Sequence, residues 1–96
     1  MEVEFPDILQ VISQMYHPHN EYITVKRLRK VIGIESEDGK QVRKLANTLV
    51  WLELFGFLEL DRKQTPKRYR IPPDFALKTK DIIRMYPKKK RINGSF

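Results

Sequence analysis

The apolar positions in the first third of the chain follow helical spacing. Between residues 7 and 16 they recur at i, i+3, i+4 and i+7, which predicts an amphipathic helix. A second helix is predicted over residues 25–32, after a short strand at residues 21–24, with Thr24 as its N-cap and Gly33 as the left-handed residue that ends it. The residues expected on the buried sides of these two helices are Ile8, Val11, Ile12, Met15, Val25, Leu28, Val31 and Ile32.

The longest helical pattern covers residues 40–55. It follows a polar turn that begins at Glu35, in which Ser36 or Asp38 is expected to cap the helix. Gly56 is expected to end it, because glycine adopts the left-handed conformation without strain. The side expected to be buried consists of Val42, Leu45, Ala46, Leu49, Leu52 and Glu53.

Beyond this helix the pattern changes from a helical period to alternation. Residues 57–63 and 68–71 each alternate around a short polar turn, which predicts a β-hairpin. Residues 75–86 predict one more helix, and residues 87–96 begin with a basic run that we expect to be a flexible tail. We therefore expect one domain over residues 1–86. The apolar residues expected to organise the last helix are Leu77, Ile82, Ile83 and Tyr86.

Charge is unevenly distributed along the 96 residues. The net charge is +7. Residues 1–60 hold seven Lys/Arg and nine Asp/Glu, whereas residues 61–96 hold twelve Lys/Arg and three Asp. A chain with one strongly basic half is typical of proteins that bind polyanions, and nucleic acid is the partner this favours.

Three stretches in a fixed order carry a resemblance to a known family. They are TVKRLRKVIGI, VRKLANTLVWLELFGFLEL and LDRKQTPKRYRI. In this succession the chain resembles the winged helix-turn-helix DNA-binding superfamily over residues 6–73. The resemblance implies an α+β fold, mainly α, with a three-helix core, a short strand and a C-terminal β-hairpin called the wing. The acidic turn at residues 35–41 is longer than the tight turn typical of the superfamily.

The resemblance implies that a recognition helix at about residues 38–55 enters the major groove of duplex DNA. Arginine pairs with guanine, and asparagine or glutamine with adenine. A basic wing at about residues 62–70 is implied to contact the backbone or minor groove. The expected DNA-binding residues are Lys40, Gln41, Arg43, Lys44, Asn47, Thr48, Arg62, Lys63, Lys67, Arg68 and Arg70.

Trp51 lies opposite the expected buried side of its helix. Exposed apolar groups in a cluster indicate a contact surface. Either residues 75–86 fold back over Trp51 within one chain, or two chains pair there, and we favour a homodimer because many proteins of this type bind two half-sites. The expected interface consists of Val50, Trp51, Leu54, Ile82, Ile83 and Tyr86.

The sequence does not favour an enzyme. It has no cysteine, no glycine-rich phosphate loop and no nucleophile beside a base. We expect no cofactor, metal site, small-molecule substrate or membrane association, and the lack of an export signal favours a cytoplasmic location. The leading hypothesis is a transcriptional regulator that binds duplex DNA. The alternative is a protein-interaction subunit of a replication, transcription or RNA-processing assembly, and RNA binding stays open.

Overall fold

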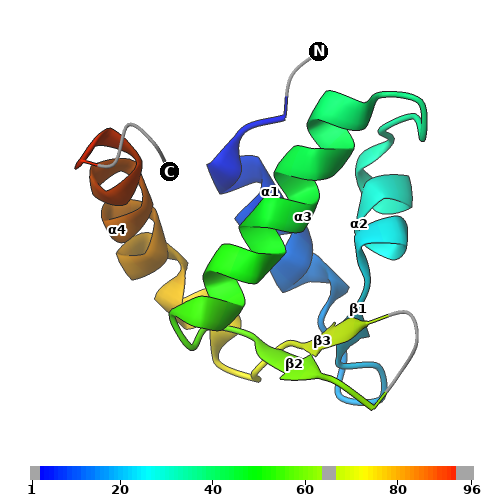
Figure 1. Cartoon of the computed structure of the whole chain (residues 1–96). Coiled ribbons are helices and arrows are strands. Elements are labelled where there is room, and N and C mark those ends of the chain that lie inside the picture. Colours follow the sequence, from blue (N-terminus) through cyan, green and yellow to red (C-terminus); the bar gives the residue numbers. More distant parts are fainter. Residues whose placement is uncertain (1–2, 64–66, 93–96) are drawn as a thin grey trace.

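The computed structural model describes residues 3–63 and 67–92, with residues 87–92 described by their backbone. Helices make up most of the chain, and three short strands form one sheet (Figure 1). The protein is therefore α+β and mainly helical, as the sequence predicts. The elements are α1 (Phe5–Met15), β1 (Tyr22–Ile23), α2 (Val25–Ile32), α3 (Gly39–Leu54), β2 (Glu59–Asp61), β3 (Arg68–Arg70), the 3₁₀ helix η1 (Phe75–Lys78) and α4 (Thr79–Ile92).

The sheet is antiparallel in the order β1-β3-β2, so β3 is its central strand. Tyr69 of β3 is opposite Leu60 of β2 on one side and Ile23 of β1 on the other. Tyr69 and Ile23 are buried and Leu60 is half-buried, so this face of the sheet joins the core. The hairpin formed by β2 and β3 confirms the alternation seen in the sequence.

Helices α1, α2 and α3 pack around an aliphatic core above this sheet. Ile8, Ile12, Leu28, Leu45 and Leu49 are all fully buried, and each lies on the side of its helix that the apolar spacing predicted. Burial of such side chains contributes about 1.5–3 kcal/mol each relative to leaving them exposed. One residue of the predicted set was assigned wrongly, because Val31 at the end of α2 is 56% exposed.

The ends of α2 and α3 follow their local sequence. The Thr24 hydroxyl accepts a hydrogen bond from the Arg27 backbone at the start of α2, and Gly33 ends that helix with φ of 94°. Asp38, one of the two caps we expected, accepts a hydrogen bond from the Gln41 backbone at the start of α3. Gly56 follows α3 with φ of 81°, so both glycines adopt the left-handed conformation that only glycine adopts at little cost.

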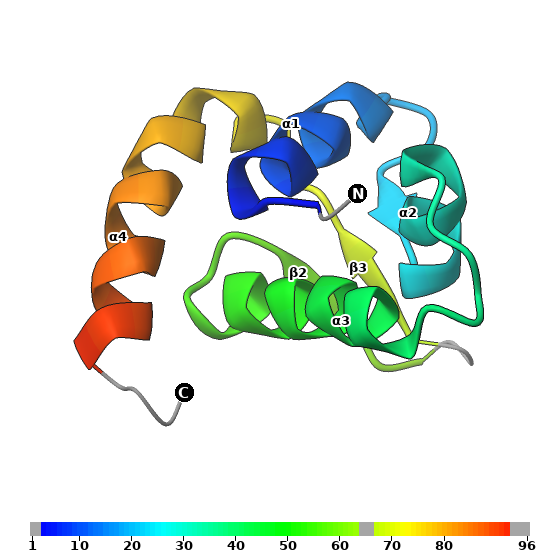
Figure 2. The same cartoon turned by 90° about the horizontal axis from the view of Figure 1, so that it is seen from above.

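The C-terminal segment folds back onto the three-helix core. Seen from above, α4 lies on one side of α1 and α3, and α2 lies on the other (Figure 2). Ile82 of α4 is fully buried, whereas Leu77 of η1 is 85% exposed, contrary to its expected packing role. The backbone remains helical to Ile92, past Pro87 where we expected the tail to begin. Within the described residues, no helix is long and apolar enough to cross a membrane.

Candidate nucleic-acid interface

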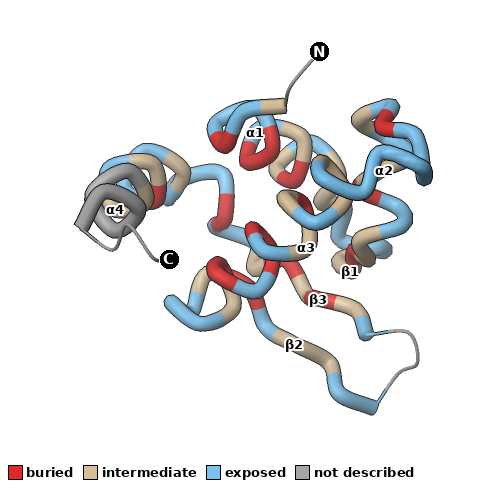
Figure 3. The backbone as a smooth tube through the Cα atoms, turned by 45° about the horizontal axis from the view of Figure 1, so that its top comes forward, coloured by how far each residue is buried: buried red, intermediate tan, exposed pale blue. Residues whose placement is uncertain are grey.

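One narrow stripe of α3 faces solvent, and its two halves differ in chemistry. Exposed positions recur along the helix, every three or four residues (Figure 3). The N-terminal half of the stripe carries Lys40, Arg43 and Asn47, which are all exposed. The C-terminal half carries Val50 and Leu54, which are 45% and 71% exposed. We call these five residues the α3 stripe. The polar half of this stripe offers hydrogen-bond donors and acceptors that can pair with base edges.

Three residues that we expected to contact DNA lie outside this stripe. Thr48 is only 3% exposed, and its hydroxyl donates to the Lys44 carbonyl oxygen at 2.8 Å. The assignment of Thr48 to the DNA-binding face is therefore wrong. Gln41 is half-buried, with its side-chain oxygen accepting from the Val3 backbone at 2.8 Å and its side-chain nitrogen donating to Asp38 at 3.3 Å. Lys44 is half-buried as well.

A cleft of about 210 Å³ lies beside α3, where α3, α4 and the start of α1 meet. This volume is below the range of about 300–1,000 Å³ usual for sites that bury a drug-sized ligand. The residues that line it are Glu4, Phe5, Pro6, Lys44, Thr48, Ile83 and Tyr86. Lys44 thus faces the side of α3 that is turned toward α4, around the helix from the α3 stripe.

The hairpin presents a second cationic surface. Arg62 and Lys63 follow β2, and Lys67 precedes β3, so all three lie toward the turn that joins the strands. Their side chains are exposed, and none forms a salt bridge with a described residue. Flexible exposed cations of this kind suit phosphate oxygens, because they can lose their own hydration partly and gain a charged acceptor.

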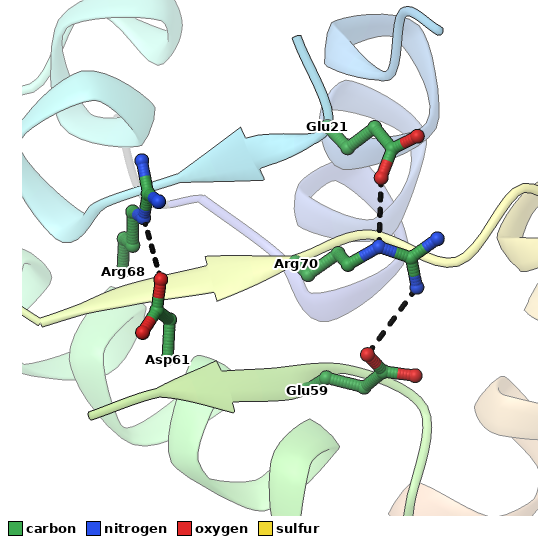
Figure 4. A network of polar contacts seen from close by, with 5 residues as sticks. All are labelled: Glu21, Glu59, Asp61, Arg68 and Arg70. Carbon is green, nitrogen blue, oxygen red and sulfur yellow. Dashed lines mark hydrogen bonds and ion pairs between the residues drawn. The ribbon is translucent and has the colours of Figure 1, made fainter. Parts of the chain in front are cut away.

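Arg68 and Arg70 form salt bridges with carboxylates of the chain, which distinguishes them from Arg62, Lys63 and Lys67. The Arg68 Nε donates to Asp61 Oδ2 at 2.9 Å, and its guanidinium carbon lies 3.8 Å from the centroid of the Tyr22 ring. Arg70 of β3 donates to Glu21, the residue before β1, at 2.7 Å and to Glu59 of β2 at 3.2 Å (Figure 4). These two arginines hold the outer face of the sheet together. Their charges are compensated within the chain, and their assignment to the DNA-binding residues stays a prediction.

The same network sets the charge state of its members. Arg68 and the Lys63 backbone both donate to the Asp61 carboxylate, which lowers its pKa below the ordinary value of 3.8. The hydrogen bond to Glu21, together with the nearby charge of Glu59, raises the pKa of Arg70. Both shifts favour the charged forms. Asp61 and Arg70 are therefore both held in their charged forms at neutral pH.

Replacing Asp61 with asparagine tests this network. Because the folded chain lowers the pKa of Asp61, the stabilisation from its charge is fully present above about pH 4 and is lost as pH falls through the lowered pKa. We expect Asp61→Asn to lower the melting temperature at neutral pH, and the difference from wild type to shrink steadily as pH falls below about 4. Thermal unfolding followed at several pH values checks this. A difference that stays constant down to about pH 2 would contradict it.

Trp51 is buried, which corrects our expectation that it would be exposed. Only 2% of its surface is accessible. Its ring lies 5.7 Å from Phe5 and 5.2 Å from Tyr86, nearly perpendicular to both, while Phe5 and Tyr86 stack at 3.8 Å. The Phe55 ring lies 4.6 Å from the Trp51 ring. Of the two alternatives for covering Trp51, the fold-back of the C-terminal segment within one chain is the one observed. Burial also raises the pKa of the Tyr86 hydroxyl.

The other residues of the expected interface differ in how far they are buried. Ile82 is fully buried inside the chain and Trp51 is 2% exposed, so neither side chain lies on the surface of the single chain, and the homodimer stays a prediction. Ile83 and Tyr86 are half-buried against the core. Val50 and Leu54 stay exposed, as expected. The helical wheel of α3 misled us because this helix is covered on two sides, by the core and by α4, whereas the wheel assumes one buried side.

Sequence reasoning missed a group of exposed cations on α2. Lys26, Arg27 and Lys30 are all exposed. Arg29, between them in sequence, instead donates to the Ile34 carbonyl oxygen at 2.8 Å and closes the end of the helix. The helical spacing that identified the buried side of α2 could also have identified this charged face, but the basic second half of the chain drew attention away from it.

Nothing in the described residues indicates a metal centre, since no three His, Cys, Asp or Glu side chains come together there. Comparison with protein-family models, with curated proteins and with solved structures found no match for this chain.

Proposed function

We propose that this chain is a winged-helix protein that binds duplex DNA, with α3 as its recognition helix and the β2–β3 hairpin as its wing. The observation that carries the proposal is the pairing of element order with surface charge. The order α1–β1–α2–α3–β2–β3, with β3 central in the sheet, corresponds to the expected three-helix core, short strand and hairpin. Both elements that would contact DNA expose cations.

The polar half of the α3 stripe would contact base edges. Arg43 can pair with guanine in a bidentate manner and Asn47 with adenine, while Lys40 can reach either a base or a phosphate. They lie on consecutive turns of an α-helix, which fits into the major groove. We do not propose this role for Gln41 and Thr48, because their side chains form hydrogen bonds within the chain. The set of base-reading residues is thus smaller than the sequence suggested.

The cations near the hairpin turn would contact the sugar-phosphate backbone. Arg62, Lys63 and Lys67 are exposed and unpaired within the described part of the chain, whereas Arg68 and Arg70 stiffen the strands that carry them. Exposed cations near the ends of these strands can contact phosphate oxygens. Such contacts fix position and orientation on the duplex but do not read its sequence.

A fluorescence-anisotropy titration of labelled random-sequence duplex DNA tests the proposal. We expect binding whose affinity falls about 10²-fold or more between about 50 mM and 200 mM salt, because each neutralised phosphate releases counterions. A single-stranded oligonucleotide and a double-stranded RNA of equal length are the matched probes. Failure of the folded protein to bind duplex DNA at low salt would refute the proposal, and tighter binding to the RNA would transfer it to RNA.

A second function is favoured by one specific observation. Val50 and Leu54 make the C-terminal half of the α3 stripe apolar and exposed. A recognition helix contacts base edges and phosphates mainly through polar side chains. As a protein-interaction subunit of a nucleic-acid assembly, the chain would use this end of α3 to contact a partner protein. Substitution of both residues by serine distinguishes the two functions, because it would leave the affinity for random duplex DNA unchanged and weaken only a protein contact.

A further inference from the structure

The cleft of about 210 Å³ between α3, α4 and the start of α1 has no role in the proposed function. None of the residues that we propose for DNA contact lines it. Its walls come from three elements that are brought together only in the folded chain (Figure 2). An apolar cavity of about 150 Å³ holds benzene, so this cleft has room for a molecule of about eight or nine non-hydrogen atoms.

One wall of the cleft is apolar and is held in place by packing behind it. Phe5, Pro6, Ile83 and Tyr86 contribute this wall. The rings of Phe5 and Tyr86 stack at 3.8 Å, and the buried Trp51 ring packs at 5.7 Å and 5.2 Å from them. Binding sites for small molecules are largely pre-formed and lined by apolar and aromatic side chains, and this wall has both properties.

The polar groups of the cleft carry opposite charges and come from different elements. Glu4, at the start of α1, contributes a carboxylate, and Lys44 of α3 contributes an ammonium group. The Glu4 side chain forms no hydrogen bond or salt bridge with a described residue. A lysine ammonium has three N–H donors, so Lys44 can bind a ligand carboxylate in addition to a contact within the chain. Thr48 adds no donor, because its hydroxyl donates to the Lys44 carbonyl oxygen.

The combination of charges restricts the ligand. An anion in the cleft would face the Glu4 carboxylate, and a cation would face the Lys44 ammonium group. A zwitterion satisfies both, since each of its charges meets an opposite charge in partly desolvated surroundings. Its remaining atoms must be apolar to contact Phe5, Ile83 and Tyr86.

We propose that this cleft binds a free α-amino acid with a branched aliphatic side chain, of the size of valine or leucine. The ligand carboxylate contacts Lys44, the ligand ammonium contacts Glu4, and the side chain lies against the apolar wall. The inference goes beyond the proposed function and does not depend on DNA binding. The sequence alone indicates no such ligand, because Glu4, Lys44 and Tyr86 meet only through the packing of α4 against α1 and α3.

Thermal unfolding in the presence of leucine tests the proposal. For a ligand this small we expect a dissociation constant of about 1 mM or lower. At about ten times that constant, binding to the folded state alone raises the apparent folding constant about 11-fold. For a domain of this size the melting temperature should then rise by about 6–11 °C. Fluorescence of Trp51, the single tryptophan, gives a second titration, because its ring contacts two residues of the wall.

Two analogues and two variants assign the charges. Isocaproate lacks the ammonium group of leucine, and isoamylamine lacks the carboxylate. We expect Glu4→Gln to weaken leucine binding about tenfold without weakening isocaproate binding, and Lys44→Gln to weaken leucine binding about tenfold without weakening isoamylamine binding. Lys30→Gln, which removes an exposed cation of α2, is the control and should bind leucine as wild type does. If Lys44→Gln does not fold, Lys44→Met takes its place.

The results separate a built site from general apolar adhesion. A wild-type melting temperature that about 10 mM leucine or valine leaves unchanged overturns the proposal. It is also overturned if both analogues bind as tightly as leucine, or if Glu4→Gln and Lys44→Gln bind leucine as tightly as wild type. Stabilisation by leucine that each of these two variants weakens, with the opposite dependence on the two analogues, supports it.

Discussion

Replacing Arg62, Lys63 and Lys67 together by glutamine is expected to weaken binding to random duplex DNA on the order of 100-fold at about 0.1 M salt, if two or three of them contact phosphates. The physical reason is counterion release, which makes each phosphate contact worth nearly one order of magnitude in affinity at that salt concentration. All three side chains are exposed and face no carboxylate within salt-bridge distance in the described chain. Their removal should therefore leave the melting temperature almost unchanged.

The contrasting variant uses the other two arginines of the hairpin. Arg68→Gln/Arg70→Gln removes the partners of Asp61, Glu21 and Glu59, so we expect a lower melting temperature. The affinity of this variant for duplex DNA, measured well below its melting temperature, should fall less than that of the variant lacking Arg62, Lys63 and Lys67. Anisotropy titrations and thermal unfolding of both variants check the pair of expectations. The reverse result, with Arg68 and Arg70 dominating affinity, would show that their carboxylate pairs open when DNA binds.

Local sequence patterns predicted most of the fold. Apolar spacing located α1, α2 and α3, and the change from helical spacing to alternation located the hairpin. Gly33, Gly56 and Asp38 ended or capped helices where expected, because glycine torsions and side-chain caps depend on neighbours in sequence. The burial of Trp51 could not be obtained in this way. It depends on Phe5 of α1 and on Tyr86 of α4, which is 35 residues further along the chain than Trp51, and a helical wheel contains no such contacts.

The candidate site was less predictable than the fold. Sequence identified the cations of the hairpin but could not tell paired from unpaired ones. Whether Arg68 faces solvent or Asp61 depends on the register of β2 against β3, which places these two residues opposite one another. Thr48 was misassigned because its side of α3 is turned toward the start of α1 and toward α4. The exposed cations Lys26, Arg27 and Lys30 of α2 were overlooked although their helical spacing was visible in the sequence. Charge composition predicts a polyanion partner, whereas the surface that we propose for it depends on tertiary structure.

Replacing Ile82 with alanine is expected to lower the free energy of unfolding by about 2–5 kcal/mol, because it removes a fully buried side chain and leaves a cavity. For a domain of this size that corresponds to a fall in melting temperature of at least about 8 °C. Leu77→Ala is the matched control. It removes an aliphatic side chain from the same C-terminal segment, but Leu77 is 85% exposed, so the change should stay within about 0.5 kcal/mol.

Ile82→Ala also tests whether Ile82 packs within one chain or between two chains. If Ile82 packs within its own chain and the protein is monomeric, the melting temperature of wild type and of Ile82→Ala does not depend on protein concentration. If Ile82 instead packed between two chains, stability would rise with concentration, because association favours the folded state by mass action. Denaturation followed by Trp51 fluorescence over a hundredfold range of concentration distinguishes these cases. Since Trp51 contacts Tyr86 of α4 directly, its emission should shift as soon as this helix leaves the core, which makes the same signal a test of whether α4 unfolds together with α1 and α3.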